Sequence, residues 1–277
     1  MAPLDLEAAA RAAEAAADRA RAEILTRFRA VATETKPDGS PVTEADRAAE
    51  QAIREVLRSA FPSFAILGEE FGAEGPGSGS HSASGSAGST RSEPTASEAY
   101  TWVIDPIDGT IGFARGIPLA STIIALLEDG EPVLGLIDLP MLGERYLGFR
   151  GAGCRRNGTP VRCSQATDLK RALVSHGDAF CFDLCNERAA WERMAAELPL
   201  LRGYTDAFGH AQVLGGGVDV MVDLHLNPWD AAATRILVPE AGGRCVTLDY
   251  PQGKLGLVFG SPALVEQLTG FLAAKPR

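Results

Sequence analysis

The sequence predicts a layered α/β protein (α+β in its first half) built from two subdomains. Its 277 residues are 45% hydrophobic and 22% charged, a composition that supports a sizeable core. Strand signals predominate after residue 100, and helices alternate with strands in the second half of the chain. We therefore predict an N-terminal α+β subdomain over residues 1–147 and a C-terminal α/β subdomain over residues 148–277.

Two helices are predicted at the start of the chain. Residues 4–30 are rich in Ala, Glu and Arg and carry a partial apolar face. Residues 36–41 are a cluster of turn-forming residues. Thr43, with Asp46 three residues later, marks the start of a second helix that ends near residue 60.

A short buried strand is expected over residues 65–67, and it leads directly into Gly68-Glu69-Glu70. The next segment, residues 72–97, consists mainly of Gly, Ser and Ala. Such a segment buries too little apolar surface to offset its ordering entropy. We therefore predict a mobile surface insertion there.

Strand signals return with residues 100–104, which lead into the sequence Asp105-Pro106-Ile107-Asp108-Gly109-Thr110. Two further strands flank Asp129-Gly130, which is a hairpin signal. These strands are residues 121–127 and 132–138. The rest of the chain predicts strands near 172–175, 218–223, 246–248 and 255–259, and helices at 186–198, 208–214, 228–241 and the C-terminus.

The composition argues against several classes of protein. A net charge of −10 leaves no basic field for nucleic acid. No apolar run approaches the roughly 20 residues of a membrane-spanning helix, and the first 30 residues lack the apolar core of a secretory signal. The five cysteines show no C-x-x-C spacing. We expect a cytoplasmic protein with free thiols and without a nucleic-acid or membrane partner.

Acidic residues gather at three points where strands end or helices begin: Glu69-Glu70, the pair Asp105 and Asp108, and Asp230. Carboxylate oxygens are the ligands that Mg²⁺ prefers. Taken singly, each group has a plainer interpretation. Glu69-Glu70 fits a solvated loop, Asp230 fits a charge at a helix N-terminus, and the Asp-Pro-x-Asp segment fits a turn.

The Asp-Pro-Ile-Asp segment suits metal and phosphate chemistry together. Pro106 constrains the backbone bend, so that the two carboxylates and the Ile107 carbonyl can face one ion. The N–H groups that follow Gly109 suit a phosphate. A metal site so close to a phosphate site indicates phosphoryl chemistry.

The chain resembles the inositol monophosphatase superfamily. The residues that carry the resemblance are Gly68-Glu69-Glu70, the segment 102–110, Trp229-Asp230 and Glu240-Ala241-Gly242-Gly243. The resemblance implies an αβαβα layered sandwich, a homodimer, and hydrolysis of a small phosphorylated metabolite with two or three Mg²⁺ ions, which Mn²⁺ can replace.

The resemblance also implies a role for each matched residue. It assigns the metal to Glu69, Asp105, the Ile107 carbonyl, Asp108 and Asp230. It assigns the attacking water to Glu70, and it gives Thr110, acting with Asp46, a catalytic role. It assigns the phosphate to the backbone of Asp108, Gly109 and Thr110. No Ser-His-Asp set, reactive cysteine or P-loop is needed for this chemistry.

Within the superfamily the chain looks most like the bacterial histidinol-phosphatase branch, chiefly through residues 36–46, 115–118 and 202–206. Arg202, Asp206 and Asp223 are the expected substrate-binding residues. Carboxylates near the leaving group suit the ammonium and imidazole of L-histidinol phosphate, an intermediate of histidine biosynthesis. The alternatives are an inositol-1-monophosphatase, a broad sugar-phosphate phosphatase or, more remotely, a non-catalytic metal-binding regulator. Asp206 also fits a helix cap.

Overall fold

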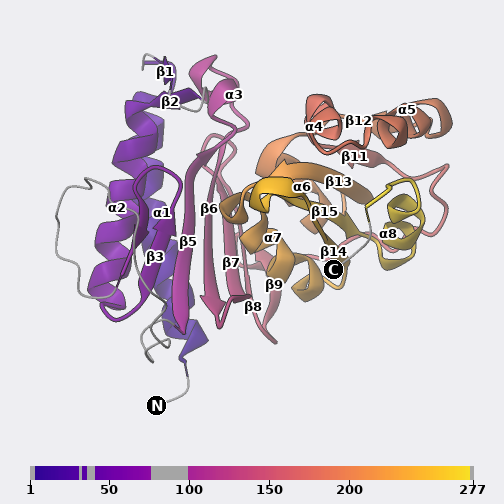
Figure 1. Cartoon of the computed structure of the whole chain (residues 1–277). Coiled ribbons are helices and arrows are strands. Elements are labelled where there is room, and N and C mark those ends of the chain that lie inside the picture. The colour runs from indigo at the N-terminus through magenta and orange to yellow at the C-terminus, as the bar shows by residue number, and fades with distance from the viewer. Residues whose placement is uncertain (1–3, 31–32, 36–40, 76–98, 275–277) are drawn as a thin grey trace.

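Five layers of secondary structure, in the order helices, sheet, helices, sheet, helices, make up the computed structural model of the protein (Figure 1). The structure describes residues 4–30, 33–35, 41–75 and 99–274. Three hydrophobic clusters fill the four spaces between these layers, because one cluster packs on both sides of the middle helices. The fold is therefore the αβαβα sandwich that the resemblance implied.

Helices α1 (Leu6–Arg27) and α2 (Glu44–Ala60) form the first layer and cover one face of the first sheet. The buried residues of α1 are alanines except for Ile24. Such small side chains let α1 pack closely against α2 and the sheet. Helix α2 begins with the capping box that the sequence predicts, between Thr43 and Asp46.

The first sheet has eight strands in the order β10-β9-β8-β7-β6-β5-β3-β4, and among them only β3 and β5 pair in parallel. Its strands are β3 (Ala65–Gly68), β4 (Gly72–Glu74), β5 (Tyr100–Asp108), β6 (Ser121–Glu128), β7 (Glu131–Leu139), β8 (Glu144–Phe149), β9 (Gly153–Arg156) and β10 (Thr159–Pro160). A small ribbon of β1 (Thr33–Thr35) and β2 (Pro41–Thr43) lies near helix α3 (Thr110–Ala114). The predicted hairpin at Asp129-Gly130 is confirmed, and both residues have left-handed φ angles.

Two boundaries differ from the sequence expectation. The predicted division after residue 147 falls inside β8, and the first sheet continues to Pro160. Strands β8 to β10 are short, and their Gly- and Arg-rich segments lack a continuous apolar alternation. At the start of the predicted insertion, Gly72–Glu74 forms β4, because β3 offers it a hydrogen-bonding edge. Residues 76–97 of the predicted insertion lie outside the described residues.

Helices α6 (Asp206–Leu214) and α7 (Pro228–Glu240) form the middle layer between the two sheets. The second sheet has the order β12-β11-β13-β15-β14. Its strands are β11 (Val174–His176), β12 (Leu201–Arg202), β13 (Val220–Leu226), β14 (Arg244–Asp249) and β15 (Leu255–Gly260). The outer face carries α4 (Ala179–Leu184), α5 (Arg188–Glu197) and α8 (Pro262–Thr269). The 3₁₀ turn η1 (Pro251–Gly253) connects β14 to β15.

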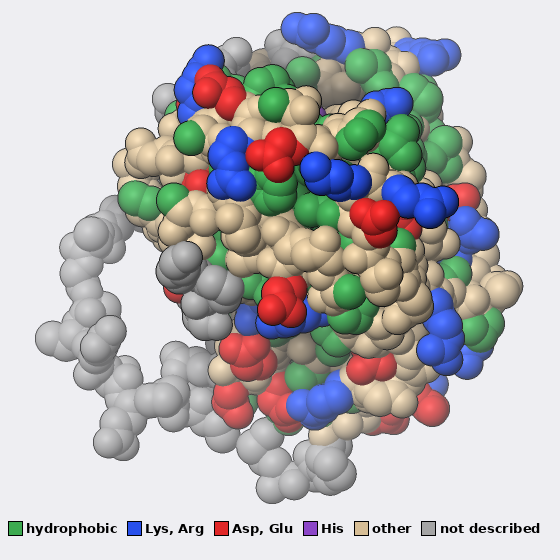
Figure 2. Space-filling model, turned by 90° about the vertical axis from the view of Figure 1, so that its right-hand side faces the viewer, with side chains coloured by type: hydrophobic (Ala, Val, Ile, Leu, Met, Phe, Trp, Pro, Cys, Tyr) green, Lys and Arg blue, Asp and Glu red, His purple; other side chains and the backbone are tan. Residues whose placement is uncertain are grey.

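Basic and acidic side chains are interspersed on the face shown in Figure 2, and neither sign gathers into one continuous patch there. Across the described ranges, no helix combines the length and the hydropathy that a membrane crossing requires.

Candidate metal centre and substrate pocket

An irregularity in β5 brings Asp105 and Asp108 to the same side of the sheet. In a regular strand, residues three apart point to opposite faces. The register of β5 against β6 shifts between these two residues, which is the effect of a β-bulge. The Asp-Pro-x-Asp segment is therefore an irregular strand end and not a simple turn. The hydroxyl of Ser121 donates to Asp108 Oδ2 at 3.2 Å, and the Ala207 N–H, at the start of α6, also donates to this oxygen.

Asp230 reaches the same place from the start of α7. The Asn227 backbone N–H donates to Asp230 Oδ2 at 2.7 Å, which closes a capping box around the first turn of α7. Lys254 donates in turn to Asn227 Oδ1 at 2.5 Å. Asp230 thus stabilises a helix terminus and contributes a carboxylate to the cluster.

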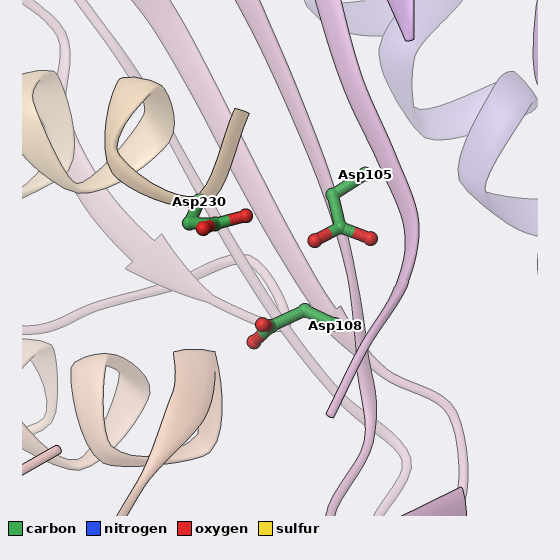
Figure 3. Close-up of side chains that lie close together, drawn as sticks. All are labelled: Asp105, Asp108 and Asp230. Carbon is green, nitrogen blue, oxygen red and sulfur yellow. The ribbon is translucent and has the colours of Figure 1, made fainter. Parts of the chain in front are cut away.

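The three aspartates converge on one point (Figure 3). One carboxylate oxygen from each of Asp105, Asp108 and Asp230 lies within 4.8 Å of the others. Burial raises the pKa values of Asp105 and Asp108 well above their usual range, and Glu69 raises that of Asp105 further. Burial also raises the pKa of Asp230 to about 7, against the opposing hydrogen bond from Asn227.

These residues fit a hard divalent cation. Among the described residues, Asp105 Oδ1 is buried and has no hydrogen-bond partner, which is costly for a carboxylate oxygen. An all-oxygen donor set of several carboxylates is what Mg²⁺, Mn²⁺ and Ca²⁺ prefer. A cation would supply the positive charge that this part of the site needs.

Glu69 and Glu70 form the turn that follows β3, beside β5. The Glu69 N–H donates to the Ile104 carbonyl at 3.2 Å, and the Glu70 N–H donates to Glu50 Oε2 at 2.7 Å. Both glutamates are half-buried, so neither side chain is fully solvated. The charge of Glu69 raises the pKa of both Asp105 and Asp230, which places Glu69 at the edge of the cluster.

A buried ion pair inside α2 holds this turn. Glu50 is fully buried and accepts hydrogen bonds from the Phe71 N–H at 3.3 Å and from Arg54 Nε at 2.7 Å. Arg54, only 3% exposed, also donates to the Gly72 carbonyl at 2.6 Å and to Glu74 Oε2 at 3.0 Å. A side chain at position 68 would meet Glu50 Oε1 at 2.1 Å, so only glycine fits there.

Asp46 and Thr110 meet next to the Ile107 carbonyl. The hydroxyl of Thr110 lies 3.2 Å from Asp46 Oδ1 and 2.9 Å from the Ile107 carbonyl oxygen, and it can donate to either. The backbone N–H and the hydroxyl of Thr43 donate to Asp46 Oδ2 at 2.8 and 2.6 Å. Burial raises the pKa of Asp46, with a smaller upward contribution from Glu69.

Gly109 allows α6 to come close to the end of β5. It has a φ of 83° and precedes α3, and a Cβ at this position would lie 3.1 Å from Asp206 Oδ2. Asp206 itself has a left-handed φ of 60°. In the described structure no backbone N–H of α6 donates to the Asp206 side chain, so Asp206 is not a helix cap.

A cavity of about 210 Å³ joins the metal cluster to the second sheet. It is lined by Asp108, Asp178, Cys181, Asp206, Ala207, His210, Asp223, Leu224, His225, Leu226 and Asp230. Burial raises the pKa of Asp206, and the neighbouring charge of Asp223 raises it further. Arg202 does not line this cavity. It is exposed on β12, and its guanidinium donates to the Leu201 carbonyl at 2.8 Å.

Sequence reasoning missed several residues that shape this site: Glu50, Arg54, Asp178, His210 and Thr234, the last through its hydroxyl, which lies 2.7 Å from His210 Nδ1. Glu50 and Arg54 carried a usable signal, because they are charged residues among the buried positions of α2. His210 carried a weaker one, as a polar residue between the buried residues of α6. Nothing local distinguished Asp178 or Thr234.

The layered α/β fold and a buried carboxylate cluster beside a cavity together suit an enzyme that uses a divalent metal ion. A model of the inositol monophosphatase family matches residues 1–274, and the chain belongs to this family. The family is metal-dependent, and its members are phosphatases, so the chain is a phosphomonoester hydrolase.

Individual relatives agree with this assignment. The chain is 36% identical to a histidinol-phosphatase of Chlorobaculum parvum, over 82% of this chain and 78% of the relative. It is 35% identical to a histidinol-phosphatase of Streptomyces coelicolor, over 95% and 96% respectively. A solved inositol monophosphatase from Anabaena superposes with a TM-score of 0.78 at 26% identity, over 97% of this chain and 96% of that one.

Proposed function

We propose that the protein is a Mg²⁺-dependent phosphatase that hydrolyses L-histidinol phosphate to L-histidinol and phosphate, in histidine biosynthesis. The observation that carries this proposal is the position of Asp206 and Asp223 in the same cavity as Asp108 and Asp230. Two carboxylates that do not belong to the metal cluster suit a leaving alcohol with an ammonium group and an imidazole. The similarity to histidinol-phosphatases supports the same substrate.

Glu69, Asp105, the Ile107 carbonyl, Asp108 and Asp230 are the residues that would hold the metal. Bound Mg²⁺ would lower the pKa of a coordinated water and neutralise charge on the leaving oxygen. Without it these carboxylates would repel a phosphate dianion. We assign the phosphate to the backbone of Asp108, Gly109 and Thr110.

Two residues near the metal cluster would position and deprotonate the attacking water. Thr110 is oriented by Asp46 at 3.2 Å, and we assign it and Glu70 to this water. Glu70 would take the proton that the water loses as its oxygen bonds to phosphorus. The P–O bond to the alcohol then breaks, and the leaving oxygen gains a proton as L-histidinol departs.

The test is phosphate release with Mg²⁺ from L-histidinol phosphate, inositol 1-phosphate and fructose 1,6-bisphosphate. We expect the highest kcat/KM on L-histidinol phosphate. The second candidate, an inositol-1-monophosphatase, is favoured by the likeness to the Anabaena structure. A preference for inositol 1-phosphate, or equal rates on all three, would retain the metal site and overturn the substrate assignment.

A further inference from the structure

His210 connects the substrate cavity to the interior of the protein. It lies in the middle of α6, lines the cavity, and is 1% exposed. Its Nε2 is 3.1 Å from Asp223 Oδ2, and its Nδ1 is 2.7 Å from Thr234 Oγ1 in α7. The ring also packs edge-on against Phe259, with ring centroids 4.7 Å apart. Both ring nitrogens therefore have a specific buried partner.

The hydrogen bonds determine which atom donates to Asp223. An ionised carboxylate only accepts hydrogen bonds, so the contact with Asp223 requires a proton on His210 Nε2. In the neutral ring Nδ1 then accepts, and the Thr234 hydroxyl donates to it. In the protonated ring Nδ1 donates to Thr234 instead. Nε2 donates to Asp223 in both cases.

This contact and a glycine confine the Asp223 carboxylate from two sides. His210 is hydrogen-bonded to Asp223 Oδ2, while a Cβ at Gly177 would lie 1.8 Å from Asp223 Oδ1. The backbone of Gly177 therefore packs directly against the second oxygen. Asp223 is only 4% exposed and cannot change its orientation without losing one of these contacts.

We propose that His210 is a positioning residue for substrate selection. Through the chain Thr234–His210–Asp223, it holds Asp223 at the cavity wall in the orientation that binds a cationic group of the leaving alcohol. This inference rests on the proposed function and extends it to residues that do not touch the reacting phosphate. The ligand class is a phosphate monoester whose alcohol carries a positive charge.

The test compares His210→Phe with His210→Gln on L-histidinol phosphate and on inositol 1-phosphate. Phenylalanine retains the ring packing against Phe259 but cannot donate to Asp223. We expect KM for L-histidinol phosphate to rise roughly tenfold or more, because hydrogen bonds to charged groups are the strong ones. The fall in kcat should be smaller, and kcat/KM for inositol 1-phosphate should change by a smaller factor. Glutamine can donate to Asp223 and accept from Thr234, so it should restore most of the KM.

Thr234→Val provides a milder variant if His210→Phe fails to fold. It removes only the hydroxyl that is hydrogen-bonded to His210 Nδ1, and we expect KM for L-histidinol phosphate to rise roughly threefold. Tyr250→Phe is the control, because it removes a partly buried hydroxyl that lies 3.3 Å from Glu187, in the same half of the chain as the fully buried Thr234. It should leave the substrate preference unchanged.

A double-mutant cycle with Asp223→Asn locates the effect. If His210 acts through Asp223, then His210→Phe should add little to KM in the Asp223→Asn background. Additive effects, or a His210→Phe enzyme with the wild-type KM for L-histidinol phosphate, would overturn this inference alone. A wild-type enzyme without preference for L-histidinol phosphate would overturn the proposed function, and this inference with it.

Discussion

Replacing Glu50 tests whether the ion pair inside α2 positions the metal site or only stabilises the fold. Glu50→Ala removes the acceptor for the N–H groups of Glu70 and Phe71, and it removes the buried partner of Arg54. Arg54 would keep Glu74 as its only carboxylate among the described residues. Glu50→Gln keeps the shape of the side chain but removes its charge.

The structure sets the size of the expected effect. Breaking a buried ion pair costs about 3–5 kcal/mol, so Glu50→Ala should lower Tm by about 6–20 °C for a protein of this size. Glu50→Gln should cost about 1–3 kcal/mol, because an amide group then faces a donor. Residues that orient metal ligands typically contribute roughly 10- to 100-fold to metal affinity. We therefore expect the Mg²⁺ concentration for half-maximal activity to rise at least about tenfold in Glu50→Ala.

The assay combines thermal unfolding with Mg²⁺ titration of activity, at a temperature where every variant is folded. Arg58→Ala is the control, because it loses a partly exposed pair with Glu74 at 2.7 Å and leaves the Glu69-Glu70 turn untouched. It should cost about 0–1 kcal/mol and retain the Mg²⁺ requirement. A Glu50→Ala protein that loses stability but keeps the wild-type Mg²⁺ requirement and kcat would refute the positioning role.

Three further predictions concern the carboxylates of the site. Asp108→Asn should reduce turnover by more than about 100-fold, measured as phosphate release, and near-normal activity would exclude Asp108 as a metal ligand. Thermal unfolding should show the metal-free variant to be at least as stable as the wild type, because one of three mutually repelling carboxylates becomes neutral. In the metal-free protein the pKa of Asp230 is raised from 3.8 to about 7, so the folded state retains a proton that the unfolded state has lost. Stability measured in chelator should therefore fall as pH rises from about 4 to about 7, and saturating Mg²⁺ should flatten this dependence; a metal-free stability that rises over that window would contradict the assignment. Asp206→Ala should raise KM for L-histidinol phosphate roughly tenfold, and far more than for inositol 1-phosphate; equal effects would remove Asp206 from substrate selection.

Local features of the chain were predictable from the sequence alone. The capping box of Thr43 and Asp46 and the hairpin at Asp129-Gly130 depend on residues a few positions apart. The sequence also placed Asp105 and Asp108 at the end of a strand, although it predicted a turn there and not the irregular end of β5. Such features follow from backbone preferences and short-range hydrogen bonds, which do not need the rest of the fold.

Only the tertiary structure decided which distant groups share one environment. It brought Asp230 to Asp105 and Asp108, and it placed Glu50 under the Glu69-Glu70 turn. It also excluded Arg202 from the cavity and left it on an exposed strand at the sheet edge. The family resemblance could indicate the metal set, but it could not supply such contacts.

His210 shows the physical reason for this division. In the sequence it is one of four histidines, and its neighbours in the chain are unremarkable helix residues. Its role depends on burial and on partners from β13 and α7, at 3.1 and 2.7 Å. The sequence by itself determined the local elements and the identity of the acidic groups. Packing of the layers determined which of these groups are buried, paired and close enough to act together.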